Sequence, residues 1–146
     1  LRMQMRPALG TDGTASNNAA SMFREMYLYA CLQKETLKDA SAVSAAQALA
    51  AATENGYRAL GFQGGSLRPG MFADLVLIDL SAPNLQPPSG ICGNLVYSAS
   101  ESNVLLTIAG GKVVYEYGDY HIGEPLEKIY GECRKRQKRL MSQASA

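Results

Sequence analysis

Two apolar, strand-like runs joined by Gly110-Gly111 constrain the fold of this chain more than any other feature. The runs are NVLLTIA, residues 103–109, and KVVYEYG, residues 112–118. Both central residues of a type I′ turn need a positive φ, which glycine adopts without steric cost. The sequence therefore predicts a tight β-hairpin at this point.

A further strand is predicted at residues 75–78, where the sequence reads LVLI. This apolar run follows a turn at Pro69-Gly70 and is bounded by Asp74 and Asp79. A short continuous apolar run between turn signals is typical of a strand that is buried on both faces. A loop is expected over residues 81–90, which contain three prolines.

Apolar side chains at helical spacing predict two helices in the first half of the chain. The first lies within residues 16–34. Three side chains near its start are candidate N-caps: Ser16, Asn17 and Asn18. The second helix follows Ser44, which forms a capping-box pattern with Gln47, and is expected to stop at Asn55-Gly56. A short helical turn is expected within residues 94–102.

The last predicted helix covers residues 124–141, with Pro125 at its first position. One face is mostly apolar and carries Leu126, Ile129, Tyr130, Cys133, Gln137, Leu140 and Met141. The same helix holds a basic cluster, namely Arg134, Lys135, Arg136, Lys138 and Arg139. Such a cluster can contact nucleic-acid phosphates. We favour the plainer interpretation that these cations complement the helix dipole and solvate the outer face.

Composition narrows the possible function classes. The chain has 146 residues, 47% hydrophobic and 18% charged, which is the composition of one globular domain. A net charge of +1 gives no overall field that would gather nucleic acid, and no apolar run is long enough to cross a membrane. Three dispersed cysteines without a CxxC pair favour reduced, partly buried thiols and a cytoplasmic location. We therefore expect neither a nucleic-acid partner nor a membrane partner.

Asp12 is the main candidate for chemistry. It lies in GTDG, after a short strand predicted over residues 3–9 and before the first helix. The plain interpretation is a turn aspartate that bonds its own backbone. However, catalytic residues of barrel enzymes lie where a strand ends and leads into a helix, and a carboxylate there can bind a metal or move a proton.

The rest of the chain offers few partners for such a site. His121 is the only histidine, and we interpret it as a partly exposed loop residue. A catalytic zinc needs about three protein ligands, so Asp12 alone cannot hold one. One histidine also supplies no convincing Ser-His-Asp or Cys-His set.

Four segments in this order resemble the C-terminal part of metal-dependent amidohydrolases. They are ALGTDGTASNN, SAAQALAAATENGYRALG, GSLRPGMFADLVLIDL and NLVYSASESNVLLTIAGGKVVYEYG. The most similar branch is that of the chlorohydrolases and aminohydrolases, which includes S-adenosylhomocysteine/methylthioadenosine deaminases and triazine hydrolases. The resemblance runs from about residue 5 to about residue 120, and the combination of motifs is much more specific than GTDG alone.

The resemblance implies an α+β fragment of a larger fold. Residues 1–62 would supply the last strand and closing helices of a TIM (β/α)8 barrel. Residues 63–120 would be the C-terminal share of a small β-sandwich built from both ends of the protein, and residues 121–146 an appended amphipathic basic helix.

By the same resemblance, Asp12 matches the aspartate of the eighth barrel strand, which binds a divalent metal, zinc or iron, and moves a proton. The metal-binding histidines of the family would lie upstream and have no equivalent here. The complete enzyme would hydrolyse a C–N or C–Cl bond on a small N-heterocyclic substrate, and the isolated chain would be inactive.

Two questions stay open at this stage. A barrel strand without its neighbours exposes an edge and apolar faces, so the chain should associate with the missing N-terminal portion, form a swapped or other homo-oligomer, or pair in a crystal. The competing function class is a non-catalytic α+β interaction module, in which the basic helix contacts a partner.

Overall fold

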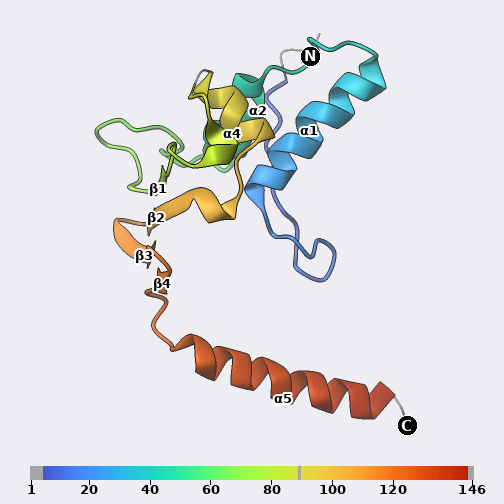
Figure 1. The fold of residues 1–146 in the computed structure, drawn as a ribbon, viewed down its shortest axis with the longest axis vertical. Coiled ribbons are helices and arrows are strands. Elements are labelled where there is room, and N and C mark those ends of the chain that lie inside the picture. Colours follow the sequence, from blue (N-terminus) through green and yellow to red (C-terminus); the bar gives the residue numbers. More distant parts are fainter. Residues whose placement is uncertain (1–4, 89, 145–146) are drawn as a thin grey trace.

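Four helices lie beside a small antiparallel sheet, and a fifth helix stands apart at the C-terminal end (Figure 1). This is a computed structural model, which describes residues 5–88 and 90–144. Residues 3 and 4 of the predicted strand 3–9, Ser89 of the predicted loop, and the ends of the two predicted terminal segments lie outside that range.

The bounds of the elements are as follows. The α-helices are α1 Met22–Leu37, α2 Ala45–Ala52, α3 Glu54–Ala59, α4 Ile91–Tyr97 and α5 Leu126–Ala144. The strands are β1 Leu75–Ile78, β2 Val104–Ala109, β3 Lys112–Glu116 and β4 Asp119–Tyr120. Two short 3₁₀ helices cover Pro83–Leu85 and Glu101–Asn103.

The core lies between α1, α2 and α4. Its buried side chains are Met26, Ala30, Val43, Ala48 and Val96. Leu9 packs against this cluster from the segment that precedes the Asp12 loop. Because alanine lets helix backbones approach closely, the alanine-rich α2 contacts both α1 and α4. Asp12 therefore follows directly on a segment that contacts the core.

The four strands pair in sequence order, β1-β2-β3-β4, and all pairs are antiparallel. The predicted hairpin is confirmed, because Ala109 pairs with Lys112 and the turn glycines Gly110 and Gly111 have φ angles of 56° and 77°. Glycine is required here since both positions lie in the left-handed region.

Strand β1 forms where the sequence predicts it, but the predicted burial on both faces is wrong. Val76 is 55% exposed and Leu77 is 50% exposed. The strand lies at the edge of the sheet and pairs only with β2 among the described residues. Leu75 and Ile78 are half-buried, so its faces are only partly covered. The apolar pattern indicates a strand that needs further cover.

The expected strand at residues 3–9 does not form within the described residues 5–9, which have no strand pairing. A strand needs a neighbouring backbone for its hydrogen bonds, and this segment lies against helices instead. Its amide at Leu9 donates to the carbonyl of Ala51 in α2 (2.8 Å).

Helix starts and ends differ from the prediction in several places. The N-cap of α1 is Ser21, whose hydroxyl accepts the amide of Arg24, so the three predicted caps are wrong. The Ser44–Gln47 capping box of α2 is confirmed. However, α2 ends at Ala52, and Asn55-Gly56 lies inside α3 rather than stopping a helix. The turn expected at 94–102 begins earlier, because α4 starts at Ile91.

Asp74 joins the helices to the sheet. Its carboxylate accepts the amide of Gly110 in the hairpin (2.5 Å) and the hydroxyl of Tyr57 in α3. These two bonds, the Gly110 amide first and the Tyr57 hydroxyl second, hold the pKa of Asp74 below its usual value. The same contact with Asp74 raises the pKa of Tyr57. The carboxylate form thus fixes α3 relative to the hairpin.

Acid should weaken this connection. Because the pKa of Asp74 is lower in the folded chain, its stabilising contribution is present above roughly pH 4 and is lost as pH falls through the folded pKa. We expect Asp74→Asn to reduce the loss of stability between roughly pH 5 and pH 2. Urea unfolding at several pH values measures it, with Asp119→Asn as the control in the same sheet. Equal pH dependence in D74N and wild type would contradict this role.

Within the described residues, no helix has the length and apolarity that crossing a bilayer demands.

Candidate functional site

Asp12 lies on an exposed loop between the core-contacting segment and α1. Its φ is 58°, a left-handed conformation that aspartate adopts more readily than most residues. One carboxylate oxygen accepts the amide of Gly13 (2.7 Å), and the hydroxyl of Thr11 donates to the Asp12 carbonyl (3.3 Å). The second carboxylate oxygen has no hydrogen-bond partner in the described part of the chain and can accept further bonds.

The loop after Asp12 is fastened to α1. The carbonyl of Gly13 accepts the amides of Ser16 and Asn17, both at 2.9 Å. The side chain of Asn17 donates to the carboxylate of Glu25 in α1 (2.6 Å) and accepts the amide of Ala19 (3.1 Å). Asn17 therefore closes the loop onto the helix instead of capping its first turn.

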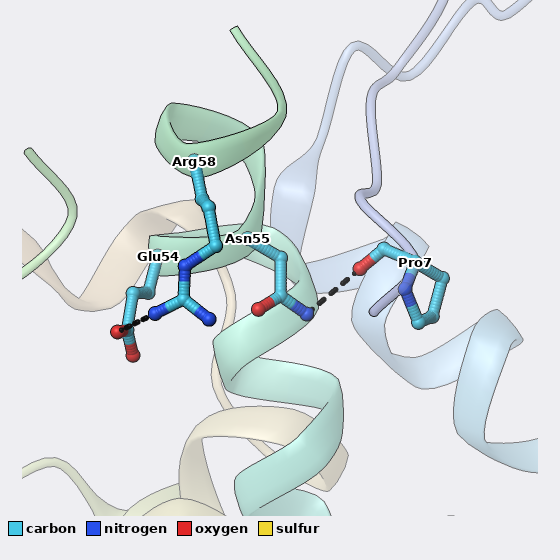
Figure 2. A network of polar contacts seen from close by, with 4 residues as sticks. All are labelled: Pro7, Glu54, Asn55 and Arg58. Atoms are coloured by element: carbon cyan, nitrogen blue, oxygen red, sulfur yellow. Dashed lines mark hydrogen bonds and ion pairs between the residues drawn. The ribbon is translucent and has the colours of Figure 1, made fainter. Parts of the chain in front are cut away.

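The segment before Asp12 is fastened to α2 and α3. Besides the bond from Leu9 to Ala51, the side chain of Asn55 donates to the carbonyl of Pro7 (2.9 Å), as Figure 2 shows. On the same helix, Arg58 pairs with Glu54 (2.7 Å) and points away from the segment (Figure 2). The hydrogen bonds of the Leu9 amide and the Pro7 carbonyl thus position the segment that leads into Asp12.

Removing the Asn55 contact should loosen this segment. We expect Asn55→Ala to cost about 1 kcal/mol locally, which is roughly a fivefold faster hydrogen exchange at the Leu9 amide. Arg58→Ala is the matched control, because it removes only a half-exposed ion pair of the same helix. Equal hydrogen-exchange rates of the Leu9 amide in the two variants would contradict the proposed role of Asn55 in holding this segment.

The described residues do not complete a metal site. Asp12 offers a carboxylate of the kind that zinc accepts, but about three protein ligands are required. In residues 5–88 and 90–144, no group of three or more histidine, cysteine, aspartate or glutamate side chains is arranged to hold a metal ion. A metal site at Asp12 would therefore need further ligands from outside the described residues.

The remaining candidates lie elsewhere. His121 is exposed in the loop after β4, as expected, with its amide bonded to the carbonyl of Val114 (2.9 Å). All three cysteines are free, and Cys31 and Cys92 are half-buried. The expectation of a partly buried thiol is wrong for Cys133, which is exposed because α5 stands apart from the other described helices and the sheet (Figure 1).

A cavity of about 430 Å³ lies between α3 and the linker to β1. Its walls are mainly apolar and include Tyr57, Leu60, Phe62 and Phe72, while Asp12 is not among its lining residues. The carboxylate of Asp12 therefore does not line this cavity.

The described residues thus form an α+β chain in which Asp12 follows a core-contacting segment and precedes α1. Residues 2–114 match the amidohydrolase family, and the chain belongs to this family.

Curated relatives are deaminases. A 5′-deoxyadenosine deaminase from Methanosarcina mazei is 39% identical over 140 residues, which cover 95% of this chain and 32% of the relative. A 5-methylthioadenosine/S-adenosylhomocysteine deaminase from Moorella thermoacetica is 42% identical over 131 residues, covering 88% of this chain and 30% of the relative. The chain therefore spans about a third of the length of the relatives it matches.

Solved structures agree with this assignment. An adenosine deaminase from Xanthomonas campestris with bound zinc matches with a TM-score of 0.90 and 36% identity, over 97% of this chain and 32% of that one. A triazine hydrolase variant matches with a TM-score of 0.77 and 22% identity, over 88% of this chain and 28% of that one, which shows a shared fold.

Proposed function

We propose that this chain is the C-terminal part of a metal-dependent aminohydrolase that removes an amino group from a purine nucleoside by hydrolysis of a C–N bond. The observation that carries the proposal is the match to named deaminases over nearly the whole chain. An interaction module without catalysis is disfavoured because the family match covers residues 2–114, including the Asp12 loop. The bond cleaved is C–N rather than C–Cl, since the relatives of higher identity are deaminases.

In this proposal, residues 1–62 supply the last barrel strand and its helices. Residues 63–120 supply the C-terminal share of a composite β-sandwich, and residues 121–146 form the appended helix. The proposal also accounts for the uncovered edge strand β1 and for Val76 and Leu77, because polypeptide from outside this chain would cover them.

Asp12 is the residue of this chain that we assign to catalysis. Its free carboxylate oxygen can accept a proton and later return it to the leaving amine, which is general base followed by general acid catalysis. It would also be the single ligand that this chain contributes to a divalent metal, zinc before iron, because the Xanthomonas deaminase binds zinc. The histidine ligands would lie in polypeptide outside this chain.

The same proposal includes a cytoplasmic location, in keeping with three free thiols, and a small N-heterocyclic substrate. Ammonia release by the complete enzyme tests it, with 5′-deoxyadenosine, 5′-methylthioadenosine and S-adenosylhomocysteine as substrates and a chlorinated triazine as the comparison. We expect ammonia from at least one nucleoside and none of the chloride release that a chlorohydrolase would give. Chloride release without nucleoside deamination would reject the proposed substrate class.

A further inference from the structure

The loop that leads from Asp12 to α1 has an uncommon backbone conformation at both ends. Asp12 has a φ of 58° and Ala20 a φ of 44°, both in the left-handed region that residues with a side chain rarely adopt. Such residues keep this conformation only where surrounding contacts hold them in it. The hydrogen bonds that hold this loop therefore determine how the Asp12 carboxylate is presented.

One pair of side chains ties this loop to the helical core. The side-chain amide of Asn17 donates to the carboxylate of Glu25 in α1 at 2.6 Å, and both residues are half-buried. Within the described part of the chain, this is the only hydrogen bond from residues 11–20 to a residue outside them. Glu25 is next in the chain to Met26, a buried member of the core, so it belongs to a fixed part of α1.

A short series of hydrogen bonds leads from this pair to Asp12. The backbone amide of Asn17 donates to the carbonyl of Gly13 (2.9 Å), and the amide of Gly13 donates to one carboxylate oxygen of Asp12 (2.7 Å). Asn17 is thus bonded to α1 through its side chain and to the turn after Asp12 through its backbone. Loss of the contact with Glu25 would release the turn that orients the carboxylate.

We propose that Asn17 and Glu25 are positioning residues for Asp12, and that their hydrogen bond holds the Asp12 carboxylate in the orientation that proton transfer requires. The pair acts through the turn at Gly13 and not by contact with the substrate. This role rests on the proposed function, because Asp12 needs a defined orientation only if it takes part in catalysis. A displacement of about 1 Å can reduce a rate about 100-fold, so a hydrogen bond remote from the reacting atoms can have a large effect.

Asn17→Asp separates the contact with Glu25 from the other contacts of Asn17. The variant keeps an oxygen that can accept the amide of Ala19, as Asn17 does at 3.1 Å, but it no longer donates to Glu25. It also places two carboxylates side by side, which repel each other. Adding Glu25→Gln restores the hydrogen bond in the opposite direction, because the amide at position 25 donates to the carboxylate at position 17. E25Q alone keeps the original direction, since its amide oxygen accepts from Asn17.

Hydrogen exchange of residues 11–20, measured by mass spectrometry on the complete enzyme, tests the positioning without any catalysis. We expect this segment to exchange about tenfold faster in N17D, the lower end of the effect of a hydrogen bond to a charged group. Exchange in N17D/E25Q should return to within about twofold of wild type. Asn18→Asp is the matched control, because Asn18 is exposed, has no hydrogen bond in the described part of the chain and gains the same charge.

Ammonia release by the complete enzyme tests the consequence for catalysis. In N17D we expect kcat and kcat/KM to fall by the same factor, about 10- to 100-fold, with KM within about threefold of wild type. The reason is that the substitution affects proton transfer and leaves substrate binding unchanged. E25Q, N17D/E25Q and the control N18D should each keep kcat within about threefold of wild type.

Three results would overturn the proposal. Exchange of residues 11–20 that is no faster in N17D than in wild type or N18D shows that the bond to Glu25 does not hold the loop. A low kcat in N17D that E25Q does not restore shows that Asn17 acts by another route. Faster exchange in N17D with unchanged kcat shows that Asp12 does not depend on the pair. A wild-type enzyme that deaminates no nucleoside rejects the proposed function instead, and the exchange data then decide alone whether the pair holds the loop.

Discussion

Replacing Asp12 by asparagine should reduce the turnover of the complete enzyme about 10²- to 10⁴-fold, the range typical of a lost general acid–base group. The amide is nearly the same size as the carboxylate, so the bond from the Gly13 amide can persist. What the variant loses is the capacity to accept a proton and return it to the leaving amine. The measurement is the steady-state rate of ammonia release from the substrate that the wild type prefers.

Two further variants complete this experiment. Asp119→Asn changes an exposed carboxylate of β4 and should leave the rate within about twofold, since a surface substitution away from the site has little effect. Asp12→Glu keeps an acid–base group at a displaced position and should retain more activity than D12N. Turnover by D12N close to that of wild type would remove Asp12 from the catalytic assignment.

Replacing Gly65 by alanine should strongly destabilise the chain. A Cβ at this position would lie 2.6 Å from the Glu54 Cα and 2.8 Å from its amide nitrogen, both backbone atoms of α3. Backbone cannot move aside as a flexible side chain can, so α3 and the linker must separate. The φ of Gly65, 78°, adds the strain of a left-handed alanine.

Gly61→Ala is the matched control for this substitution. Gly61 has a similar φ of 74°, but a Cβ there meets nothing within 4 Å. We expect G65A to lower the free energy of unfolding by about 1–3 kcal/mol more than G61A, which is the usual cost of overpacking. Urea unfolding of the two variants measures this difference. Equal urea midpoints for G65A and G61A would show that the close approach of the linker to α3 does not exclude a side chain at position 65.

The local elements of this fold follow from the sequence wherever a short motif determines them. The Gly110-Gly111 hairpin and the Ser44–Gln47 capping box form as predicted because each depends on backbone conformations or bonds within a few residues. The N-cap of α1 was missed because four polar residues precede the helix, and Asn17 bonds Glu25 instead. Several side chains could satisfy the local rule, and tertiary contact decided among them.

Features that depend on distant segments could not be predicted in this way. The prediction that β1 is buried on both faces is wrong. An apolar run indicates that a strand needs to be covered, but it does not show whether the same chain provides the covering residues. The hydrogen bond from Asn55 to Pro7 joins residues 48 positions apart. In the sequence, Asn55 followed by glycine predicts the end of a helix, and nothing nearby indicates its contact with Pro7. The sequence singles out Asp12 by its place between a predicted strand and a helix. That strand does not form in residues 5–9, which pack on helices instead, and the catalytic role of Asp12 stays a prediction.

Zinc content measured on the 146-residue chain and on the complete enzyme tests the central claim most directly. After dialysis against excess zinc and then against metal-free buffer, we predict no stoichiometric zinc on the chain alone, because its described residues hold no group of three ligands. The complete enzyme should retain zinc in stoichiometric amount, and D12N should retain less. Stoichiometric zinc together with deaminase activity on the isolated chain would contradict the account, as would a complete enzyme that binds no metal.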